Sequence, residues 1–494
     1  MSLPSRRLTL VIFCCFIVKI ILALYLPLLN DEAYAIAVSR EFSLSFFDHP
    51  PIGFWSSSLF TKLFGLENYF LFRLPYLLFG LGTTFVLFEL GKELGDQTTG
   101  IWSALIYNLS PFFLFSGGFL VVPDGPLNFG IVAAALCVIK LHNKPSEKDN
   151  LLLILLGISL ALALASKYQA YLFGFGCLLV LLISPKKTAF LKNPYFYLCF
   201  VIALLGTVPT VLWNLQNQWI SFQFHGARQG SSIQIGNFIQ MLLGMIIYLL
   251  PPIFLIPLIK LKDYLSTISK HIKRPSPLDR LLVLMALPNI VVFTFVFISS
   301  KNTFPHWIMP GWLLLLPIVA KSLGHSKRKI QRLLLSGSVL IIWPFLGLLI
   351  IHAQTGFLTN RLEQLPAWDN TLEILDWTPI KKPLQHLIEA NRGPSRPKLA
   401  ALTWMEAGQI SAVMKNQYET HVLEGDPHHF SFLKKSNITS QTFLVKISLG
   451  LKPDIINTLK RLRKQDAKAV HLKDVVLVRG VRDYATASIY MLNQ

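Results

Sequence analysis

Eleven long apolar segments constrain the fold of this 494-residue chain more than any other feature of its sequence. A helix needs roughly 20 mostly apolar residues to cross the hydrocarbon core of a bilayer. The candidate spans cover residues 8–28, 69–90, 100–118, 126–141, 151–166, 168–184, 195–213, 237–259, 281–299, 304–320 and 332–352. Segment 52–64 is amphipathic, so we expect it to lie at the membrane interface or to re-enter the membrane. These patterns predict a polytopic α-helical membrane protein.

The overall composition excludes a soluble enzyme and a disordered chain. Hydrophobic residues make up 53% of the chain and charged residues only 15%, whereas soluble domains average about 25% charged residues. The mean hydropathy is +0.51. A net charge of +20 would suggest nucleic-acid binding in a soluble protein. In a membrane protein, the positive charges must first be assigned to one side of the membrane, because their distribution indicates the orientation of the chain.

The positive charges indicate how the chain is oriented in the membrane. If the N-terminus is cytoplasmic, the loops on that side contain 20 Lys and Arg residues and the opposite loops contain 5. Cytoplasmic loops carry such an excess, and these cations suit contact with anionic lipid rather than nucleic acid. The chain beyond residue 352 then lies on the outer, periplasm-like side. No small-residue cleavage site follows the first span, so we expect a retained helix rather than a signal peptide.

Residues 353–494 differ in composition from the rest of the chain. They hold 19 Lys and Arg and 13 Asp and Glu residues, with no apolar run of span length. The pattern of apolar residues predicts strands over 398–404, 442–447 and 475–479, and helices over 406–415 and 453–465. We therefore expect a transmembrane domain over residues 1–352 and a small periplasmic α/β domain over residues 353–494.

The first outer loop brings two adjacent carboxylates to the mouth of the helix bundle, where ionisable groups are unfavourable and often functional. Asp31 and Glu32 follow Asn30, a residue type that often caps a helix, and acidic side chains also stabilise a first helical turn. Either this structural role or general-base catalysis by Asp31 explains the pair, and Tyr34 flanks it. The rigid Pro-Pro turn after His49 could hold this side chain toward a cavity.

The second and third outer loops add a carboxylate and a lysine. Asp124 lies among apolar residues at the start of a span, where it is either a helix cap or a functional carboxylate. Lys167 lies in a very short loop and therefore close to membrane depth. Its ammonium group either extends toward the aqueous interface or pairs with an anionic group.

The last two outer loops hold histidines and further cations among aromatic residues. His225 and Arg228 are three residues apart and would share one face of a helix. The planar guanidinium of Arg228 matches the geometry of phosphate oxygens. Lys301 and His306 flank the start of another span, where aromatic residues are common at the membrane interface. Each of these residues alone also has an ordinary interfacial explanation.

Together, the outer loops collect carboxylates, three histidines, two lysines and an arginine on one side of the membrane. Carboxylates beside cations in an aromatic-lined opening suit a phosphate-bearing substrate and a nucleophile that must lose a proton. No HExxH, Walker-type or GxSxG motif accompanies them. The five cysteines lie in apolar runs without a CxxC pattern, so we expect no disulfide framework and no cysteine-bound metal.

The order of these motifs resembles bacterial GT-C fold glycosyltransferases of the protein mannosyltransferase type. Lipid A aminoarabinose transferases and lipopolysaccharide galacturonosyltransferases share the pattern. The resemblance covers about residues 8–320, and the first-loop Asp-Glu pair followed by His-Pro-Pro is its most specific part. It rests on Asp31-Glu32 with Tyr34, His49-Pro50-Pro51, Pro123-Asp124, Ser166-Lys167-Tyr168, His225 with Arg228, and Pro305-His306-Trp307. Within residues 353–494, only Trp404 to Gln409 supports it.

The resemblance implies a GT-C fold of about 11–13 transmembrane helices. Such an enzyme moves a sugar from a polyprenyl-phosphate donor to an acceptor that faces the periplasm. The family's first-loop aspartate, its proposed base, matches Asp31, and its second-loop aspartate matches Asp124. The lysine that contacts phosphate matches Lys167, with His225 or Arg228 assisting.

The resemblance further implies a reaction that inverts the anomeric carbon. Asp31 takes a proton from an acceptor hydroxyl or orients it, and the acceptor attacks the anomeric carbon opposite the phosphate. Glu32 stands beside the base among the candidate catalytic carboxylates. The remaining candidates for substrate contact are Tyr34, His49, Tyr168, Lys301 and His306.

The expected partners are a polyprenyl-phosphate-linked sugar, membrane lipid and an acceptor, with no nucleic acid. Lipid A or lipopolysaccharide core is our first expectation for the acceptor and a protein hydroxyl the second, whereas hexose, aminoarabinose and galacturonate all remain open as the sugar. We expect no cofactor and catalysis without a metal, although Asp31, Glu32 and His49 could meet a divalent cation if the loop folds back. We expect the protein in the bacterial inner membrane with its site facing the periplasm.

Two other functional classes fit parts of the sequence. A transporter or flippase of lipid-linked sugars would also have many helices with charged residues, but transporters place these groups near the membrane midplane and contain repeats. A non-catalytic scaffold would explain residues 353–494 but not the polar residues of the outer loops. Glycosyl transfer therefore explains the sequence best.

Overall fold

The structure is a computed structural model in which contacts group the chain into two compact units. It describes residues 3–65, 69–143, 149–184, 187–227, 233–259, 277–300, 304–325, 329–357, 370–434, 441–449, 468–480 and 482–493. The first unit, here called the bundle unit, comprises Met1–Ala23, Ser43–Gly53 and Arg73–Trp343. The second, the C-terminal unit, comprises Leu24–Phe42, Phe54–Phe72 and Pro344–Gln494. Two segments of the N-terminal part thus belong with the C-terminal residues, and the expected domain boundary at residue 352 stays a prediction.

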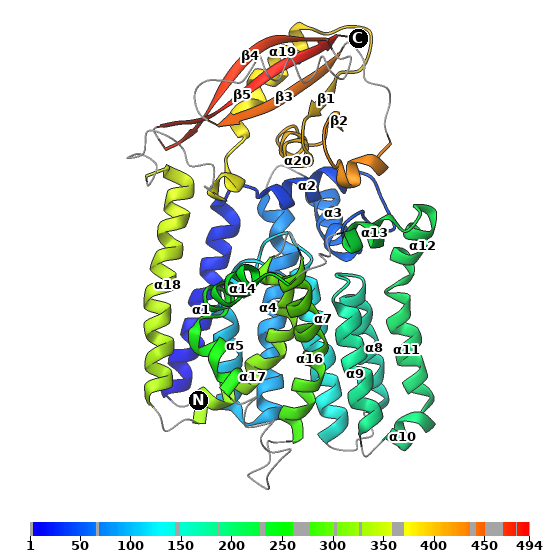
Figure 1. Ribbon diagram of the computed structural model, residues 1–494, viewed down its shortest axis with the longest axis vertical. Coiled ribbons are helices and arrows are strands. Elements are labelled where there is room, and N and C mark those ends of the chain that lie inside the picture. The colour runs from blue at the N-terminus through cyan, green and yellow to red at the C-terminus, as the bar shows by residue number, and fades with distance from the viewer. Residues whose placement is uncertain are drawn as a thin grey trace. The chain divides into compact units, whose positions relative to one another are not determined.

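Apolar helices build the bundle unit (Figure 1). Their bounds are α1 (Leu3–Tyr25), α4 (Tyr69–Leu94), α5 (Gln97–Leu109), α6 (Pro111–Phe115), α7 (Asp124–Asn143), α8 (Asp149–Leu164), α9 (Ala170–Ile183), α10 (Lys187–Lys192), α11 (Pro194–Leu205), α12 (Val208–Gln216), α13 (Ile220–Ala227), α14 (Ile235–Leu249), α16 (Pro277–Ser299), η1 (Pro305–Ile308), α17 (Met309–His325) and α18 (Lys329–Thr355). The helices α1, α4 and α18 each continue into the C-terminal unit. Extensive contacts join α7 to α8, α8 to α11, α5 to α17 and α9 to α16.

The expected polytopic helical fold is confirmed. Among the described residues, five helices are long and apolar enough to cross a membrane, or up to eight spans if each bent helix pair counts as one. Two shorter apolar helices, Asp149–Leu164 and Ala170–Ile183, cover the predicted segments 151–166 and 168–184. Each helix bonds most of its backbone groups internally, as a segment surrounded by hydrocarbon must.

Three of the predicted spans are broken rather than continuous. Segment 100–118 is interrupted before Pro111, which starts α6. The span that contains α11 and α12 bends by 42° between them. Segment 237–259 bends by 114°, at Leu250, whose φ of 68° lies in the left-handed region immediately before Pro251. Because a proline disfavours helical backbone at the preceding residue, Pro111 and Pro251 explain the first and third breaks.

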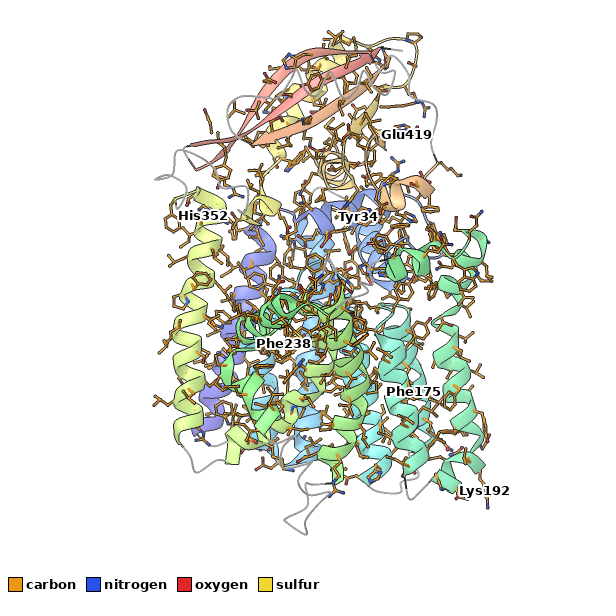
Figure 2. The ribbon with its side chains drawn as sticks, viewed as in Figure 1. Tyr34, Phe175, Lys192, Phe238, His352 and Glu419 are labelled. Atoms are coloured by element: carbon orange, nitrogen blue, oxygen red, sulfur yellow. The ribbon has the colours of Figure 1, made fainter. Side chains whose placement is uncertain are left out.

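Large apolar side chains remain exposed on the helices of the bundle unit. Phe175 of α9 is 53% exposed and Phe238 of α14 is 44% exposed (Figure 2). Only 6% of the most apolar stretch of α18 is buried. A soluble protein rarely exposes so much contiguous apolar surface, whereas lipid tails cover such a surface in a membrane.

The buried cations Lys19 and Arg73 connect helices of the bundle unit. Lys19 of α1 donates a hydrogen bond to Asn108 Oδ1 on α5 at 2.7 Å, and Asn108 Nδ2 donates to Thr84 Oγ1 at 3.0 Å. Arg73 of α4 donates to the backbone oxygen of Ala23 at 3.0 Å. Charged groups in the membrane interior need such partners, and these bonds attach α1 to α4 and α5.

The C-terminal unit contains a five-stranded mixed sheet and several short helices (Figure 1). Its elements are α2 (Asn30–Val38), α3 (Ile52–Phe64), η3 (Asn370–Ile374), η4 (Thr378–Ile380), α19 (Lys381–Ala390), β1 (Lys398–Ala401), α20 (Trp404–Val413), β2 (Glu419–Val422), η5 (His428–Phe432), β3 (Thr442–Leu449), β4 (Lys468–Arg479) and β5 (Arg482–Asn493). The strand order is β2-β1-β3-β5-β4. β1 is parallel to both neighbours, and β5 is antiparallel to both of its own.

The expected α/β character of the C-terminal residues is confirmed. The predicted strands at 398–404, 442–447 and 475–479 match β1, β3 and β4, and the predicted helix at 406–415 matches α20. The predicted helix at 453–465 lies outside the described residues. The sequence did not predict β2, β5 or α19. α20 contacts β1, β2 and β3 and thereby rests on one end of the sheet.

Gly157 lets α8 approach α11 closely. A Cβ atom at this position would lie 2.8 Å from the backbone oxygen of Cys199, a contact that side-chain rotation cannot relieve. We predict that Gly157→Ala lowers the free energy of unfolding by about 1–3 kcal/mol, as overpacking of a core does. Thermal unfolding of the purified protein in detergent measures this change.

Gly174→Ala on α9 is the matched control for this substitution. No atom lies within 4 Å of its Cβ position, and Ala is a better helix former than Gly. The melting temperature should therefore stay unchanged or rise slightly. A Gly157→Ala variant that melts at the wild-type temperature would contradict the close packing of α8 and α11.

Candidate active site

A buried ion pair between Asp124 and Lys167 is the main polar feature of the bundle unit. Lys167 Nζ lies 3.0 Å from each carboxylate oxygen of Asp124, and the two residues are 7% and 4% exposed. Asp124 is the first residue of α7, where the positive end of the helix dipole favours a carboxylate. Of the two alternatives open for Lys167, the structure therefore has the anionic partner. The pair offers both a cation and a proton acceptor.

The turn between α8 and α9 fixes the position of Lys167. The backbone N–H groups of Ser166 and Lys167 donate to the backbone oxygen of Ala163 at 3.0 and 3.2 Å. The backbone oxygen of Ala165 accepts a hydrogen bond from the N–H of Ile52 at 3.0 Å. The loop before α3 is therefore attached to the same turn. Hydrogen bonds between backbone groups alone fix the main chain of Lys167.

His306 lies immediately before α17. It lies in η1, within electrostatic range of both Lys167 and Asp124. Gln169 Nε2 donates a hydrogen bond to the backbone oxygen of Trp307 at 3.1 Å, which ties the α8–α9 turn to η1. Gln169 was not selected from the sequence, although its position directly after the Lys-Tyr dipeptide was an available signal.

A second group of predicted residues meets at the same turn. His225 Nε2 donates a hydrogen bond to the backbone oxygen of Asp48 at 2.9 Å, and His49 Nε2 lies 3.8 Å from Asp48 Oδ2. The ring centroids of His49 and His225 are 6.4 Å apart, and Tyr168 contacts His225 edge to face at 5.2 Å. The loop before α3, the α8–α9 turn and α13 thus converge.

The bundle unit therefore brings six of the predicted residues together in two adjoining groups. The groups are Asp124, Lys167 and His306, and His49, Tyr168 and His225. The consecutive residues Lys167 and Tyr168 connect them. This arrangement can neutralise an anion through the lysine and can donate or accept protons through the imidazole rings.

The first-loop carboxylates lie in the C-terminal unit, on α2, and have different surroundings. Asp31 is exposed, whereas Glu32 is fully buried. Glu32 Oε2 accepts a hydrogen bond from the backbone N–H of Leu29 at 3.1 Å. The expectation that Asn30 caps the helix is wrong, because α2 begins at Asn30 and Leu29 precedes it as the cap residue. The Glu32 carboxylate thus bonds to a backbone N–H group at the start of α2, where the cap residue has no polar side chain.

Tyr34 is buried inside the C-terminal unit (Figure 2). Its hydroxyl accepts a hydrogen bond from the backbone N–H of His429 at 3.1 Å. Its ring contacts the side chains of Phe54, Trp404, His428 and Phe430. These contacts account for Tyr34 as a packing residue, and its contact with substrate stays a prediction.

Glu373 is a carboxylate near Asp31 that no sequence motif marks. It lies in η3, and burial together with the negative charge of Asp31 raises the pKa of Glu373. When two carboxylates come close, one of them keeps its proton to a higher pH. No local pattern could have revealed Glu373, because its approach to Asp31 depends on contacts between distant parts of the chain.

Arg228 and Lys301 lie outside the described residues, so their predicted contacts with substrate stay predictions. Within the described ranges, no group of three or more His, Cys, Asp or Glu side chains has the arrangement of a metal site. The predicted roles of the other site residues are likewise predictions, now with a defined geometry.

Comparisons with known proteins bear on both the sequence and the fold. Residues 48–213, which include Asp124 and Lys167, match the family model described as dolichyl-phosphate-mannose-protein mannosyltransferase. A crystal structure of ArnT from Cupriavidus metallidurans bound to undecaprenyl phosphate aligns over 98% of both chains, with a TM-score of 0.67 and 15% identity. The apo structure of that protein aligns over 99% of this chain and 98% of that chain, with a TM-score of 0.66 and 15% identity. A search of the curated proteins found no match.

Removal of one partner of the Asp124–Lys167 pair leaves an uncompensated charge in a buried site. We predict that Lys167→Met lowers the free energy of unfolding by about 3–5 kcal/mol, the usual effect of breaking a buried pair. The double variant Asp124→Asn/Lys167→Met should recover most of this loss because neither charge remains. Thermal unfolding of the three proteins in detergent measures both effects.

Lys92→Met provides the control for charge removal. Lys92 pairs with Glu89 at 2.9 Å, and the two side chains are 41% and 42% exposed, so this solvent-accessible pair contributes little to stability. This variant should therefore melt close to the wild-type temperature. If Lys167→Met proves no less stable than Lys92→Met, the Asp124–Lys167 pair does not hold the α8–α9 turn.

Proposed function

We propose that this membrane protein, which has the GT-C glycosyltransferase fold, transfers a sugar from a polyprenyl-phosphate donor to an acceptor on the periplasmic side of the bacterial inner membrane. The observation that carries the proposal is the buried Asp124–Lys167 pair. His306 lies within electrostatic range of this pair, and Tyr168, which follows Lys167 in the chain, contacts His225. The pair supplies a fixed ammonium group, that of Lys167, which can bind the phosphate of a lipid-linked sugar.

Lys167 is the residue proposed to bind the donor phosphate. Negative charge develops on the phosphate oxygens as the sugar leaves, and an ammonium group in a low-dielectric site stabilises that charge strongly. Asp124 holds the ammonium group in place through two 3.0 Å contacts. Loss of the cation should raise the reaction barrier by about 3 kcal/mol, by analogy with loss of one oxyanion-stabilising group.

Asp31 is the proposed general base. Its carboxylate is exposed in the first turn of α2, as a group that must accept a proton from an incoming hydroxyl needs to be. The acceptor oxygen bonds to the anomeric carbon, the bond from that carbon to the phosphate oxygen breaks, and the hydroxyl proton passes to Asp31. Attack opposite the phosphate inverts the anomeric configuration.

The remaining polar groups are proposed to orient the substrates. His49, Tyr168 and His225 form one contiguous group, and aromatic and imidazole side chains suit contact with a sugar and its phosphate. Arg228 and Lys301 are assigned to the same task from their place in the sequence. Glu32 is proposed to act through the start of α2, because its carboxylate is bonded to Leu29.

The donor carrier proposed here is undecaprenyl phosphate. Support comes from ArnT, whose crystal structure with undecaprenyl phosphate shares the fold over 98% of this chain. Lipid A or lipopolysaccharide core is the acceptor we favour, and a protein hydroxyl is the second choice.

The reaction is proposed to proceed without a metal ion, because polyprenyl phosphate is a good leaving group and Lys167 can neutralise it. Transfer should therefore survive treatment with EDTA. Activity that is lost with the chelator and restored by Mg²⁺ or Mn²⁺ would overturn this part of the proposal.

A panel of donors tests the function and identifies the sugar. Proteoliposomes with the purified protein receive either lipid A or lipopolysaccharide core as acceptor, together with undecaprenyl phosphate that carries mannose, 4-amino-4-deoxyarabinose or galacturonic acid. Mass spectrometry should detect lipid A with the added mass of one of these sugars. Failure with all three donors, with lipid A and with lipopolysaccharide core as acceptors, would contradict the preferred function.

Asp31→Asn should abolish transfer, because the amide cannot accept the acceptor proton. We expect at least a hundredfold loss of kcat at wild-type protein levels, at the low end of the effect of a general base. Asp483→Asn, which neutralises an exposed carboxylate of the same unit, is the control and should leave the rate unchanged. Wild-type turnover by Asp31→Asn would remove Asp31 as the base.

A further inference from the structure

We infer that α20 of the C-terminal unit is the element that positions Asp31, with Gly408 and Gln409 as its positioning residues. The inference rests on the proposed function, since it gives a role to the element that holds the proposed base. α2 has only nine residues, and a helix of this length is not stable on its own in water. Tertiary contacts must therefore fix the direction in which Asp31 points.

Gln409 holds the start of α2. Its Nε2 group donates hydrogen bonds to the backbone oxygen of Leu28 at 3.1 Å and to Asn30 Oδ1 at 3.0 Å. These acceptors lie immediately before Asp31 in the chain, and Gln409 is 2% exposed. A single buried amide group thus restrains the backbone at the point where α2 begins.

Gly408 lets the two helices touch through their backbones. A Cβ atom at this position would lie 2.8 Å from the backbone nitrogen of Tyr34 and 2.9 Å from its Cα atom. Any larger residue must push α2 away from α20. On the same stretch of α2, the Tyr34 hydroxyl accepts the hydrogen bond from the His429 N–H, so the middle of the helix is held from two sides.

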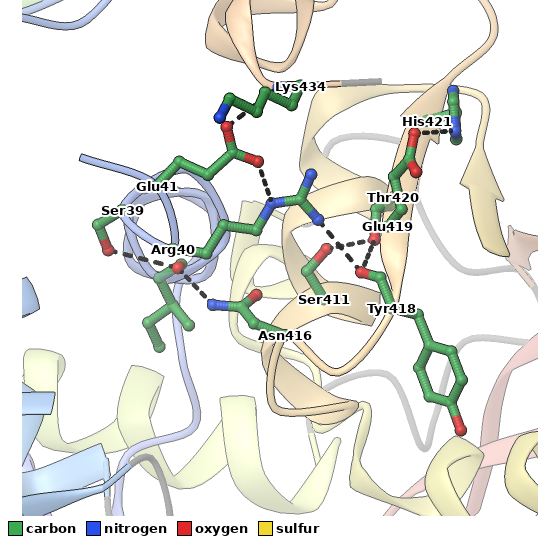
Figure 3. A network of polar contacts seen from close by, with 11 residues as sticks. Ser39, Arg40, Glu41, Ser411, Asn416, Tyr418, Glu419, Thr420, His421 and Lys434 are labelled. Carbon is green, nitrogen blue, oxygen red and sulfur yellow. Dashed lines mark hydrogen bonds and ion pairs between the residues drawn. The ribbon is translucent and has the colours of Figure 1, made fainter. Parts of the chain in front are cut away.

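A separate network holds the far end of α2 (Figure 3). Asn416 Nδ2 donates to the backbone oxygen of Ile36 at 2.8 Å, and Arg40 donates to the backbone oxygen of Tyr418 at 3.2 Å. Glu41, which pairs with Arg40 at 3.5 Å, also accepts a hydrogen bond from the backbone N–H of Lys434. Residues after α20 thus fasten both α2 and the chain that follows it.

The sheet in turn holds α20. Thr403 caps α20 by accepting a hydrogen bond from the N–H of Glu406, while Glu406 Oε2 accepts one from the N–H of Thr403. The other carboxylate oxygen of Glu406 accepts a hydrogen bond from the backbone N–H of Ile447 in β3 at 3.1 Å. A continuous set of bonds therefore runs from β3 through α20 to the residues that precede Asp31. The sheet supplies a rigid support for a short helix that carries a reactive group.

The test uses Gln409→Met, which keeps the size of the side chain but removes its donor. Misplacement of a catalytic group by about 1 Å can reduce the rate a hundredfold, so we expect kcat to fall at least about tenfold. The KM for the undecaprenyl-phosphate sugar used by the wild type should change less than about twofold, because the hydrogen bonds of Gln409 go to Leu28 and Asn30 at the start of α2. Hydrogen exchange of the peptide over residues 28–38 should be about tenfold faster.

Two controls separate positioning from a general loss of structure. Gln441→Met removes an equivalent buried donor, whose Nε2 bonds to the backbone oxygen of Asn391 at 2.7 Å, away from α2. It should leave kcat and the exchange of residues 28–38 at wild-type values. Gly408→Ala should reproduce the kinetic effect of Gln409→Met, whereas Gly347→Ala, at a helical glycine with no atom within 4 Å, should not.

The outcomes for the two proposals are distinct. If the wild type transfers sugar and Gln409→Met matches Gln441→Met in kcat and in exchange, the positioning role is wrong. If Gln409→Met changes KM alone, Gln409 acts on substrate binding and the inference is also overturned. If the wild type transfers none of the sugars, the proposed function fails. In that case hydrogen exchange still tests the inference. If residues 28–38 exchange at the wild-type rate in Gln409→Met, α20 does not restrain α2.

Discussion

The ion pair between Asp124 and Lys167 is the interaction on which the candidate site depends. Asp124 is buried at the start of α7 and Lys167 in the turn between α8 and α9, so loss of either charge leaves the other uncompensated. The pair also fixes the turn between α8 and α9, because Lys167 is bonded through its main chain to Ala163 as well as through its side chain to α7. The neighbouring Tyr168 and His225 are arranged around that turn. The buried Lys167 is the cation that we propose to bind the donor phosphate.

In the C-terminal unit, the main structural requirement is to hold the short helix α2, which carries Asp31. The proposed role of Asp31 as base requires an exposed carboxylate that is held in one orientation, and the short helix α2 cannot provide this orientation by itself. Glu32 caps the helix from within, and Gln409 restrains its start from α20. None of the described residues of the mixed sheet is a candidate catalytic residue, and the hydrogen bond from Ile447 to Glu406 connects the sheet to α20. This explains why the residues from 24 to 42 belong with the C-terminal unit in their contacts.

The sequence predicted the features that a membrane environment requires, namely the apolar helices and the charged residues at their ends. The length of the apolar segments located the membrane helices, and the outer loops revealed Asp124 and Lys167 because charged residues near a bilayer are conspicuous among apolar neighbours. Their mutual pairing remained one of two alternatives, since it depends on packing between α7 and the α8–α9 turn. The roles of Glu373 and Gln409 were not predicted, because they too depend on tertiary packing. Their partners are hundreds of residues away in the chain. Two of the three breaks in the spans follow from Pro111 and Pro251, whose local effect on the backbone a hydropathy pattern does not reveal.

The central claim is that this protein breaks the bond between a sugar and a polyprenyl phosphate. The most direct test measures free undecaprenyl phosphate and glycosylated acceptor together, in proteoliposomes with the purified protein, a radiolabelled undecaprenyl-phosphate sugar and lipid A. We predict that both products appear in equal amounts, and only when the acceptor is present. Movement of the intact labelled donor across the bilayer, without release of undecaprenyl phosphate, would contradict glycosyl transfer and identify a flippase instead.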